Sequence, residues 1–290
     1  MGSKVYIDGK LVAREDAKIS VFDHGLLYGD GVFEGIRSYG GLIFKLSEHL
    51  DRLFESAQTI MLKVPMSKKE LEKATVETLK ANGLKDAYIR LIITRGVGDL
   101  GLDPRKCKKA SIIIIADKIA LYPKKFYEKG LDLITVPTRR NLSEAINPQV
   151  KSLNYLNNIM AKMEAINSGY EEALMLSSEG YVLECTGDNI FIYTGGRLYT
   201  PPFCLGVLKG ITRGAVIEIS QKLKIPVSEH VMTRHELYNA EEAFLTGTAA
   251  EIIPVVKIDG RVIGDGKPGK VTLKLLSQFR KLTKTDGVKY

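Results

Sequence analysis

Two short segments of the sequence, one with a lysine and one with a carboxylate, have the residue types needed for Schiff-base chemistry. Lys151 follows an Asn-Pro turn and directly precedes a helical pattern. Glu184 is the one acid in an apolar, strand-like run that ends in a polar turn. Burial favours the neutral amine, which can attack an aldehyde, and an ionised acid can pair with a protonated ring nitrogen. Each residue alone is more often an ordinary surface side chain, so the prediction depends on further features of the chain.

Two turns of small residues could bind an anion such as a phosphate. Gly210 lies in a loop that leads into a helical pattern over residues 214–223, and the free N–H groups at a helix start attract anions. The residues Gly-Thr-Ala at 247–249 follow a strand-like run, and successive N–H groups there could form an anion-binding nest. The pattern at Gly210 is also common at ordinary helix starts, so a plain helix start stays an alternative.

An arginine and a glycine-rich segment near the beginning of the chain are further candidates. Arg52 flanks the apolar stripe of a helical pattern capped by Ser47, and it is either a snorkelled surface residue or an anion anchor. Residues 25–35 hold four glycines interleaved with aromatic residues, among them Tyr28 and Phe33. This pattern indicates backbone close to a ligand or, alternatively, tight packing in a glycine-rich sheet.

The composition indicates a globular protein that binds small molecules. The 290 residues include 42 Lys and Arg against 34 Asp and Glu, and the resulting net charge of +8 is spread along the chain. A spread charge favours anionic small molecules over a nucleic-acid surface. The three cysteines lack metal-binding or disulfide spacing, and the longest apolar run, residues 112–116, is too short to cross a membrane. We therefore expect a cytoplasmic protein with no metal site and no nucleic-acid or membrane partner.

The hydrophobic patterns predict two domains joined by a linker. Residues 1–119 form the predicted N-terminal domain, residues 120–129 the linker and residues 130–290 the C-terminal domain. The first domain is predicted to contain strands near 5–12, 42–44, 87–96 and 110–116 and helices near 47–57 and 67–82. The second is predicted to contain strands near 131–136, 173–176, 181–184, 189–193 and 197–200, helices near 155–168, 214–223 and 271–282, and a polar tail. The helix at 155–168 has apolar positions at Ile159, Met160, Met163 and Ile166.

Four motifs, in this order, resemble those of the class IV, or fold-type IV, pyridoxal-phosphate aminotransferases. They are residues 28–37 (YGDGVFEGIR), 184–191 (ECTGDNIF), 210–213 (GITR) and 247–251 (GTAAE), and the resemblance covers essentially the whole chain. Within this family the sequence is most similar to the branched-chain amino acid aminotransferases. The resemblance implies a two-domain α+β/α/β fold with a smaller N-terminal α/β domain and a larger, β-rich C-terminal domain of pseudo-barrel form. It also implies pyridoxal 5'-phosphate as the cofactor, bound in the cleft between the domains.

The resemblance implies a role for each matched cofactor residue. Lys151 would be the Schiff-base lysine and the base that moves a proton between the substrate Cα and cofactor C4′, while Glu184 pairs with the pyridine nitrogen. Tyr155 would hydrogen-bond the phenolic oxygen, and Leu208 would pack on the ring. The phosphate would be held by Arg52, Thr248 and the backbone amides of Ile211 and Thr212, and the cofactor site further includes Asn189, Gly210 and Gly247.

The substrate site implied by the resemblance has a polar and an apolar part. The turn of Thr248 and Ala249, together with Tyr88, would receive the α-carboxylate, and Arg90 would engage the side-chain carboxylate of glutamate. Tyr28 and Phe33 would wall the side-chain pocket. An apolar wall with one arginine at its rim can serve an aliphatic substrate and then a dicarboxylate, because Arg recognises carboxylates through two bonds.

The implied reaction is the ping-pong transamination of L-leucine, L-isoleucine and L-valine with 2-oxoglutarate, which gives branched-chain 2-oxo acids and L-glutamate. A D-amino acid aminotransferase or an aminodeoxychorismate lyase of the same fold is the alternative. Leu91 stands where many branched-chain enzymes have proline, and residues 94–96, Thr-Arg-Gly, are similar to those of the D-amino acid relatives. The family works as a dimer or larger assembly, so we expect a homodimer or a dimer-based hexamer in which the loop near residues 96–104 completes a neighbour's site.

Overall fold

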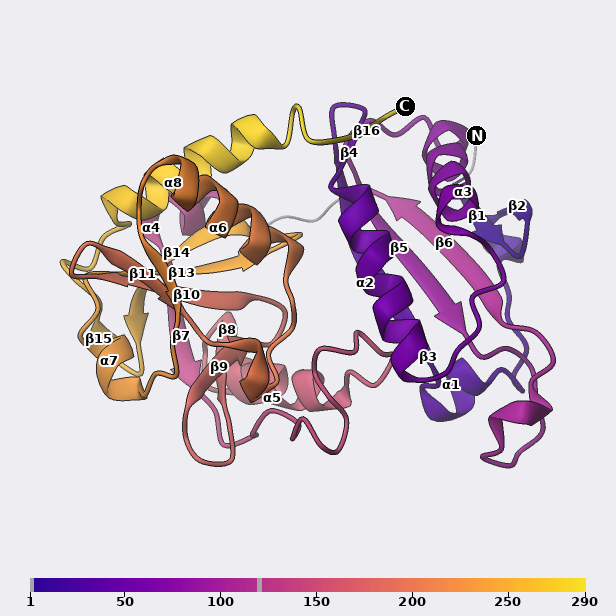
Figure 1. Cartoon of the computed structure of the whole chain (residues 1–290), viewed down its shortest axis with the longest axis horizontal. Helices are drawn as coiled ribbons and strands as arrows, with labels where there is room; N and C mark the ends of the chain where they lie inside the picture. Colours follow the sequence, from indigo (N-terminus) through magenta and orange to yellow (C-terminus); the bar gives the residue numbers. More distant parts are fainter. Residues whose placement is uncertain (1–2, 119–121) are drawn as a thin grey trace. The chain divides into compact units, whose positions relative to one another are not determined.

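The computed structural model describes residues 3–118 and 122–290, which form two compact units (Figure 1). The first unit consists of residues 1–120, 150–154 and 283–290, and the second consists of residues 121–149 and 155–282. The predicted domain ranges differ from these units because residues 150–154 and 283–290 belong to the first unit and not to the second. Both segments join that unit through hydrogen bonds to strands distant in the sequence, which local composition does not reveal.

The first unit is an antiparallel sheet of seven strands in the order β16-β4-β3-β5-β6-β1-β2. The strands are β1 (Lys4–Ile7), β2 (Lys10–Ala13), β3 (Gly31–Tyr39), β4 (Leu42–Phe44), β5 (Ala87–Thr94), β6 (Ser111–Asp117) and β16 (Gly287–Lys289). The helices are α1 (His24–Tyr28), α2 (Leu46–Thr59) and α3 (Lys68–Ala81). α2 packs against β3, and α3 packs against β6 and β1.

The alternation of side chains along β3 separates an apolar face from a functional face. Val32 and Ile36 point to the core beneath the helices, which also contains Leu50 and Leu53 of α2. Phe33 points to the opposite face, because successive side chains of a strand alternate. The same alternation in β5 places its odd-numbered residues in the core and its even-numbered residues beside Phe33.

The second unit is a nine-stranded sheet in which β9 pairs with both β8 and β10. The ring β10-β13-β14-β7-β8-β9 therefore closes into a barrel, as the resemblance predicted. The strands are β7 (Leu131–Thr135), β8 (Glu172–Leu176), β9 (Val182–Cys185), β10 (Asn189–Thr194), β11 (Arg197–Thr200), β12 (Val227–Glu229), β13 (Glu242–Gly247), β14 (Glu251–Ile258) and β15 (Arg261–Val262). The helices are α4 (Lys124–Lys129), α5 (Leu156–Asn167), α6 (Ile211–Lys222), α7 (Arg234–Tyr238) and α8 (Lys270–Leu282). α4 occupies the predicted linker and packs against β14.

Two helix starts differ from the predicted ones. α2 begins at Leu46 after Lys45, which has a left-handed backbone conformation, so Ser47 lies inside the helix rather than at its cap. α6 begins at Ile211 rather than at Gly214, with Gly210 as its N-cap. The second difference matters for function, because the residues predicted to be a loop are the first turn of the helix.

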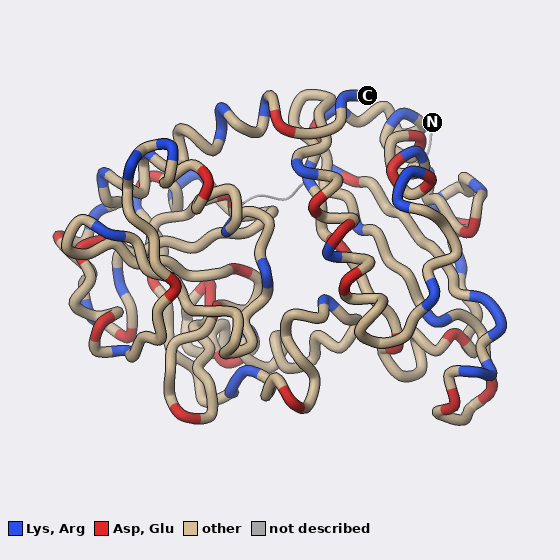
Figure 2. Tube along the Cα trace, viewed as in Figure 1, with Lys and Arg blue, Asp and Glu red and all other residues tan. Residues whose placement is uncertain are grey.

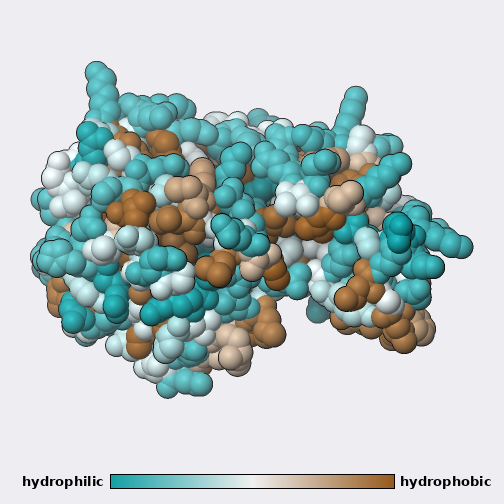
Figure 3. All heavy atoms as spheres, turned by 60° about the horizontal axis from the view of Figure 1, so that its bottom comes forward, coloured by the Kyte–Doolittle hydropathy of each residue, from teal (hydrophilic) through white to brown (hydrophobic). Residues whose placement is uncertain are grey.

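α5 buries its small residues and exposes its large apolar ones. Ala161 and Ala165, four residues apart, are fully buried against the barrel. The predicted apolar positions of this helix are exposed by 43–58%, and they are Ile159, Met160, Met163 and Ile166. Apolar atoms also reach the surface in several other places (Figure 3).

Charged residues of both signs are interspersed along the chain in both units (Figure 2). This distribution agrees with the even spread of charge in the sequence. None of the helices in residues 3–118 and 122–290 is both long enough and apolar enough to span a membrane.

Candidate functional site

In the first unit, Phe33 of β3 brings two cationic side chains together on the sheet face opposite the helices. The Cζ atom of Arg90 lies 4.5 Å from the centroid of the Phe33 ring, and Lys151 Nζ also lies 4.5 Å from it. Arg90 reaches the ring because β3 and β5 pair in a register that sets Gly35 opposite Arg90 and Phe33 opposite Ile92. The structure therefore brings together three residues predicted to act in the site.

Tyr88 joins this group because Gly35 leaves room for its hydroxyl. A Cβ atom on Gly35 would lie 2.1 Å from Tyr88 Oη, so no larger residue fits there without moving Tyr88. Arg90 Nη2 donates a hydrogen bond to the same hydroxyl at 3.2 Å. The face thus combines an aromatic wall, one guanidinium group and one phenol beside the lysine.

Lys151 is fixed through its backbone rather than through a helix of its own. Its carbonyl accepts a hydrogen bond from the Phe33 N–H at 2.9 Å, and Leu153 N–H donates to the Gly31 carbonyl at 3.0 Å. The Lys151 N–H donates to Ser56 Oγ of α2 at 3.1 Å. The segment 150–154 therefore runs along the start of β3, and the lysine side chain is half-buried.

Arg52 is buried on α2 and forms a bidentate pair with Glu34 of β3. Arg52 Nε donates to Glu34 Oε1 and Arg52 Nη2 donates to Glu34 Oε2, both at 2.7 Å. His49 Nδ1 contacts Glu34 Oε2, also at 2.7 Å. Burial alone would raise the pKa of Glu34, but Arg52 and His49 outweigh it and lower that pKa to about 2.

Tyr28 lies at the end of α1, where its contacts are with a neighbouring loop. Its hydroxyl donates to the Leu100 carbonyl at 2.5 Å, and its ring meets the His24 ring edge-on at a centroid distance of 5.1 Å. Tyr28 is 37% exposed. The loop near residues 96–104 thus orders this side chain within the same unit.

In the second unit, three donors hold the Glu184 carboxylate. Arg140 Nε donates to Oε1 at 2.8 Å, and Asn189 Nδ2 and the Leu208 N–H donate to Oε2 at 3.1 and 3.0 Å. Asn189 reaches Glu184 because the two residues are direct partners across β9 and β10. The buried arginine and the two further donors fix the position of both carboxylate oxygens of Glu184.

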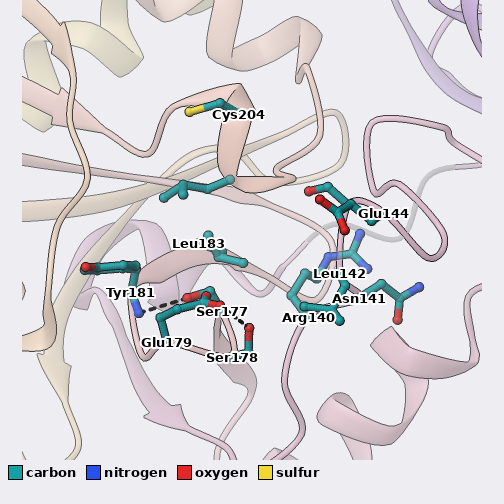
Figure 4. Close-up of a pocket in the computed structure, with 12 residues that line it drawn as sticks. Arg140, Asn141, Leu142, Glu144, Ser177, Ser178, Glu179, Tyr181, Leu183 and Cys204 are labelled. Atoms are coloured by element: carbon teal, nitrogen blue, oxygen red, sulfur yellow. Dashed lines mark hydrogen bonds between the residues drawn. The ribbon is translucent and has the colours of Figure 1, made fainter.

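A small cavity of about 20 Å³ brings the predicted ring-binding residues together within this unit. The lining includes four of the predicted cofactor-binding residues: Tyr155, Glu184, Asn189 and Leu208. Arg140 also lines a larger cavity of about 470 Å³, shown in Figure 4 with the loops around residues 141–144 and 177–183. None of the catalytic, cofactor-binding or substrate-binding residues predicted from the sequence lines the larger cavity.

The start of α6 has the features of an anion site. Its N-cap, Gly210, makes no side-chain cap hydrogen bond, so the first-turn N–H groups of Ile211 and Thr212 are suited to an external acceptor. A Cβ atom on Gly210 would lie 2.0 Å from Asn189 Oδ1. Gly210 is therefore needed for Asn189 to keep its contact with Glu184.

The turn between β13 and β14 also depends on a close approach. Gly247 pairs with Glu251 across the hairpin, so Thr248 and Ala249 lie in the turn itself. A Cβ atom on Gly247 would lie 1.8 Å from Asp188 Oδ1. The turn is thereby packed against the loop that follows Glu184.

Three residues of these networks were missed by sequence reasoning. Glu34 and His49 surround Arg52, and Arg140 holds Glu184. The signal for Glu34 was present, because it is an acid at a core-facing position of β3, between Val32 and Ile36. Arg140 lies in an irregular polar segment, and nothing in its sequence neighbourhood distinguishes it from a surface arginine.

The residues of each unit fit a phosphorylated pyridine aldehyde. The first unit offers an amine beside an aromatic ring, and the second offers a hydrogen-bonded carboxyl group and a helix start without a side-chain cap. No group of three or more His, Cys, Asp or Glu residues in the described ranges, 3–118 and 122–290, could hold a metal ion.

Comparison with known proteins identifies the family. The model of the family described as "Amino-transferase class IV" matches residues 31–258. The putative branched-chain-amino-acid aminotransferase of Methanocaldococcus jannaschii is 52% identical over 286 residues, 99% of this chain and 98% of that protein. The branched-chain-amino-acid aminotransferase of Escherichia coli K12 is 38% identical over 281 residues, 95% of this chain and 91% of that protein.

Solved structures agree with this similarity. A crystal structure of the branched-chain amino acid aminotransferase of Escherichia coli has a TM-score of 0.95 at 37% identity, covering 98% of this chain and 95% of the other. The branched-chain enzyme from T.th. with pyridoxamine 5'-phosphate has a TM-score of 0.94 at 38% identity, with the same coverage. The chain therefore belongs to the class IV aminotransferases and has their fold-type IV architecture.

Proposed function

We propose that this protein is a pyridoxal-phosphate-dependent aminotransferase that converts L-leucine, L-isoleucine and L-valine to their 2-oxo acids, with 2-oxoglutarate as the amino acceptor. The observation that carries this proposal is the group of Phe33, Tyr88 and Arg90 beside the amine of Lys151. Aromatic walls suit a branched aliphatic side chain, and a single guanidinium group suits the second carboxylate of glutamate. The relatives and solved structures named above carry the same activity in their names.

The cofactor, when bound, supplies an electron-withdrawing ring that stabilises negative charge at the substrate Cα. Lys151 would hold the cofactor through its amine and would serve as the base that moves a proton at the substrate Cα. Glu184 would pair with the ring nitrogen, and its three donors hold the carboxylate in a fixed position. Tyr155 would donate to the phenolic oxygen and Leu208 would pack on the ring; both line the small cavity beside Glu184.

Different residues are proposed to bind the cofactor phosphate and the substrate carboxylates. In the first unit, Arg52 would bind the phosphate and Tyr88 the α-carboxylate. In the second unit, Thr248 and the first-turn amides of Ile211 and Thr212 offer donors suited to a phosphate, and the turn of Thr248 and Ala249 offers donors suited to a carboxylate. A solved structure of the T.th. branched-chain enzyme contains 4-methylvaleric acid. This molecule has the branched aliphatic shape that the predicted side-chain pocket, walled by Tyr28 and Phe33, would bind.

The hydrogen bonds of Arg95 favour L-amino acids over D-amino acids as the substrates. Its guanidinium donates to both carboxylate oxygens of Asp30, at 2.8 and 2.9 Å, and to the carbonyls of Ile60 and Met61. These bonds occupy most of its five N–H groups, so Arg95 serves to order the loops. An arginine committed in this way is poorly placed to bind a substrate carboxylate.

The assay that tests the proposal uses the purified protein and its Lys151→Ala variant. Wild-type protein should take up pyridoxal phosphate, and borohydride should leave a phosphopyridoxyl group on Lys151 that mass spectrometry locates. A panel of L-leucine, L-isoleucine, L-valine, D-alanine and aminodeoxychorismate should show turnover with the three L-amino acids, and Lys151→Ala should abolish it. A protein that ignores pyridoxal phosphate, or that prefers D-alanine, contradicts the proposal.

We also infer a cytoplasmic homodimer, alone or as part of a dimer-based hexamer. The exposed apolar side chains of α5 and of the loops with Phe22, Leu100 and Leu102 are the surfaces that support self-association. The three free cysteines suit a reducing compartment. Light scattering after size-exclusion chromatography should give at least twice the mass of one chain, and a monomer at micromolar concentration contradicts the inference.

A further inference from the structure

Glu34, His49 and Arg52 form a fully buried polar cluster at the contact of β3 with α2. The three side chains are each no more than 6% exposed, and Glu34 is not exposed at all. His49 and Arg52 are three residues apart and therefore lie on one face of α2. Both oxygens of Glu34 are used: Oε1 by Arg52, and Oε2 by Arg52 and His49.

Stability alone does not explain why this cluster is buried. The neighbours of Glu34 on the same face of β3 are Val32 and Ile36, which pack in the apolar core. Apolar side chains of similar volume usually stabilise such an interface at least as well as a buried ion pair does. The cluster therefore points to a role beyond the packing of α2 on the sheet.

The geometry of the cluster fixes the direction of the Arg52 guanidinium. Two parallel bonds from Nε and Nη2 to one carboxylate set both the plane and the rotation of the group. Glu34 is ionised and can only accept, so His49 Nδ1 carries the proton and donates it. Burial lowers the pKa of His49, although Glu34 acts in the opposite direction.

The same face of α2 also sets the position of Lys151. Ser56 lies four residues after Arg52, and its hydroxyl accepts the Lys151 N–H. His49, Arg52 and Ser56 thus form one buried polar stripe along α2. The stripe fixes the guanidinium relative to the backbone of the lysine within one compact unit.

We propose that Glu34 and His49 are positioning residues that orient Arg52 to receive the phosphate of an aldehyde cofactor whose carbonyl reaches Lys151. The inference rests on the proposed function and goes beyond it, because neither residue touches the cofactor. Glu34 and His49 act only through Arg52. Their effect should therefore appear in the affinity for the phosphate group and not in the affinity for the pyridine aldehyde.

The first test compares pyridoxal phosphate with pyridoxal as ligands of the apoprotein. Glu34→Gln keeps the shape of the side chain but removes the bidentate carboxylate, and it should lower the affinity for pyridoxal phosphate relative to pyridoxal by about tenfold or more. The ratio of the two dissociation constants does not depend on how much of the variant is folded. If the carboxylate merely competed for the charge of Arg52, its removal would tighten pyridoxal phosphate instead. Either that result or an unchanged ratio overturns the inference.

The second test leaves the Glu34–Arg52 pair intact and changes only the histidine. His49→Leu removes the donor to Glu34 and should shift the same ratio in the same direction. His49→Asn should restore it, because the amide Nδ2 can donate from nearly the position of Nδ1. An equal shift in both variants, or none in His49→Leu, contradicts the positioning role.

Two controls separate this inference from general damage and from the proposed function. Asp286→Asn breaks the 3.0 Å pair with Lys45 beside the start of α2, so it should lower stability but leave the ratio unchanged. In an Arg52→Gln background, Glu34→Gln should have no further effect on the ratio, and an additive loss overturns the inference. If wild-type protein fails to bind pyridoxal phosphate at Lys151, the proposed function itself fails; if it binds and the variants do not differ, only the inference fails.

Discussion

Phe33 holds an amine and a guanidinium group together on one face of the first sheet. Its ring contacts the Lys151 amine and the Arg90 guanidinium, each 4.5 Å from the centroid. A cation near an aromatic face gains electrostatic stabilisation, which orients the flexible side chains of both residues. Gly35 completes the arrangement, because only a residue without Cβ leaves space for the hydroxyl of Tyr88.

Replacing Arg90 should impair the reaction of dicarboxylate substrates much more than the reaction of aliphatic ones. In Arg90→Gln we expect kcat/KM for the L-glutamate half-reaction to fall roughly a hundredfold, because a charge-assisted bond to the side-chain carboxylate is lost. The L-leucine half-reaction should change only a few-fold. Single-turnover kinetics of each half-reaction measure the two values on one preparation. Equal losses in both would mean that Arg90 acts through the packing of Phe33 and not through recognition.

The buried pair of His49 and Glu34 should make stability fall on acidification. Burial lowers the pKa of His49 in the folded protein, so below about pH 6.5 the unfolded chain binds more protons and stability decreases. Glu34, whose pKa is lowered to about 2, adds a second decrease once the pH falls below about 4.5. Urea unfolding at a series of pH values should show both, and His49→Asn should lose less stability than wild type between pH 7 and 5. Parallel curves for the two proteins would contradict this assignment.

At the scale of elements, a helix start and a strand pair depend on the same small residue. Gly210 is the N-cap of α6, and its missing Cβ leaves space for Asn189 Oδ1. Asn189 in turn links β10 to the carboxylate on β9. The first turn of α6, which is proposed to bind the phosphate, and Glu184, which is proposed to pair with the ring nitrogen, are therefore coupled through Asn189.

Gly210→Ala should disturb both features at once. The new methyl group would lie 2.0 Å from Asn189 Oδ1, so we expect the affinity for pyridoxal phosphate to fall about tenfold or more as the Glu184 contact is displaced. Gly214→Ala is a matched control on the same helix, because nothing lies within 4 Å of its Cβ position. It should keep the affinity and raise the unfolding free energy by about 0.5–1 kcal/mol. Absorbance titration and urea unfolding test both variants, and a normal affinity in Gly210→Ala would contradict the coupling.

At the scale of the whole molecule, the chain end returns to the unit in which the chain began. β16 extends the first sheet by pairing with β4, and Tyr290 Oη bonds Ser38 Oγ at 2.7 Å and donates to the Leu84 carbonyl at 2.8 Å. Lys45 is held by the carboxylate of Asp286 at 3.0 Å. The final residues, predicted to be a polar tail, are thus part of the folded sheet.

Shortening the chain should therefore destabilise the first unit. Deletion of residues 287–290 exposes the edge of β4 and removes the Tyr290 bonds, and it should lower the unfolding free energy by more than Tyr290→Phe does. The single substitution should cost about 1 kcal/mol, the usual net value of a buried hydrogen bond. Urea unfolding measures both. If the deletion variant has the same unfolding free energy as the full-length protein, β16 contributes nothing to the stability.

The motifs of the sequence determined its resemblance to the family, and that resemblance implied the barrel of the second unit. The local patterns by themselves predicted turns of small residues, strands, and single charged residues within apolar runs. Only the tertiary structure decided the partners of those residues: Glu34 and His49 for Arg52, Arg140 for Glu184, and β4 for the chain end. It also placed the large apolar residues of α5 at the surface, because the small alanines of that helix pack against the barrel. Such pairings join residues far apart in the sequence, and their free energy depends on burial that no local pattern contains.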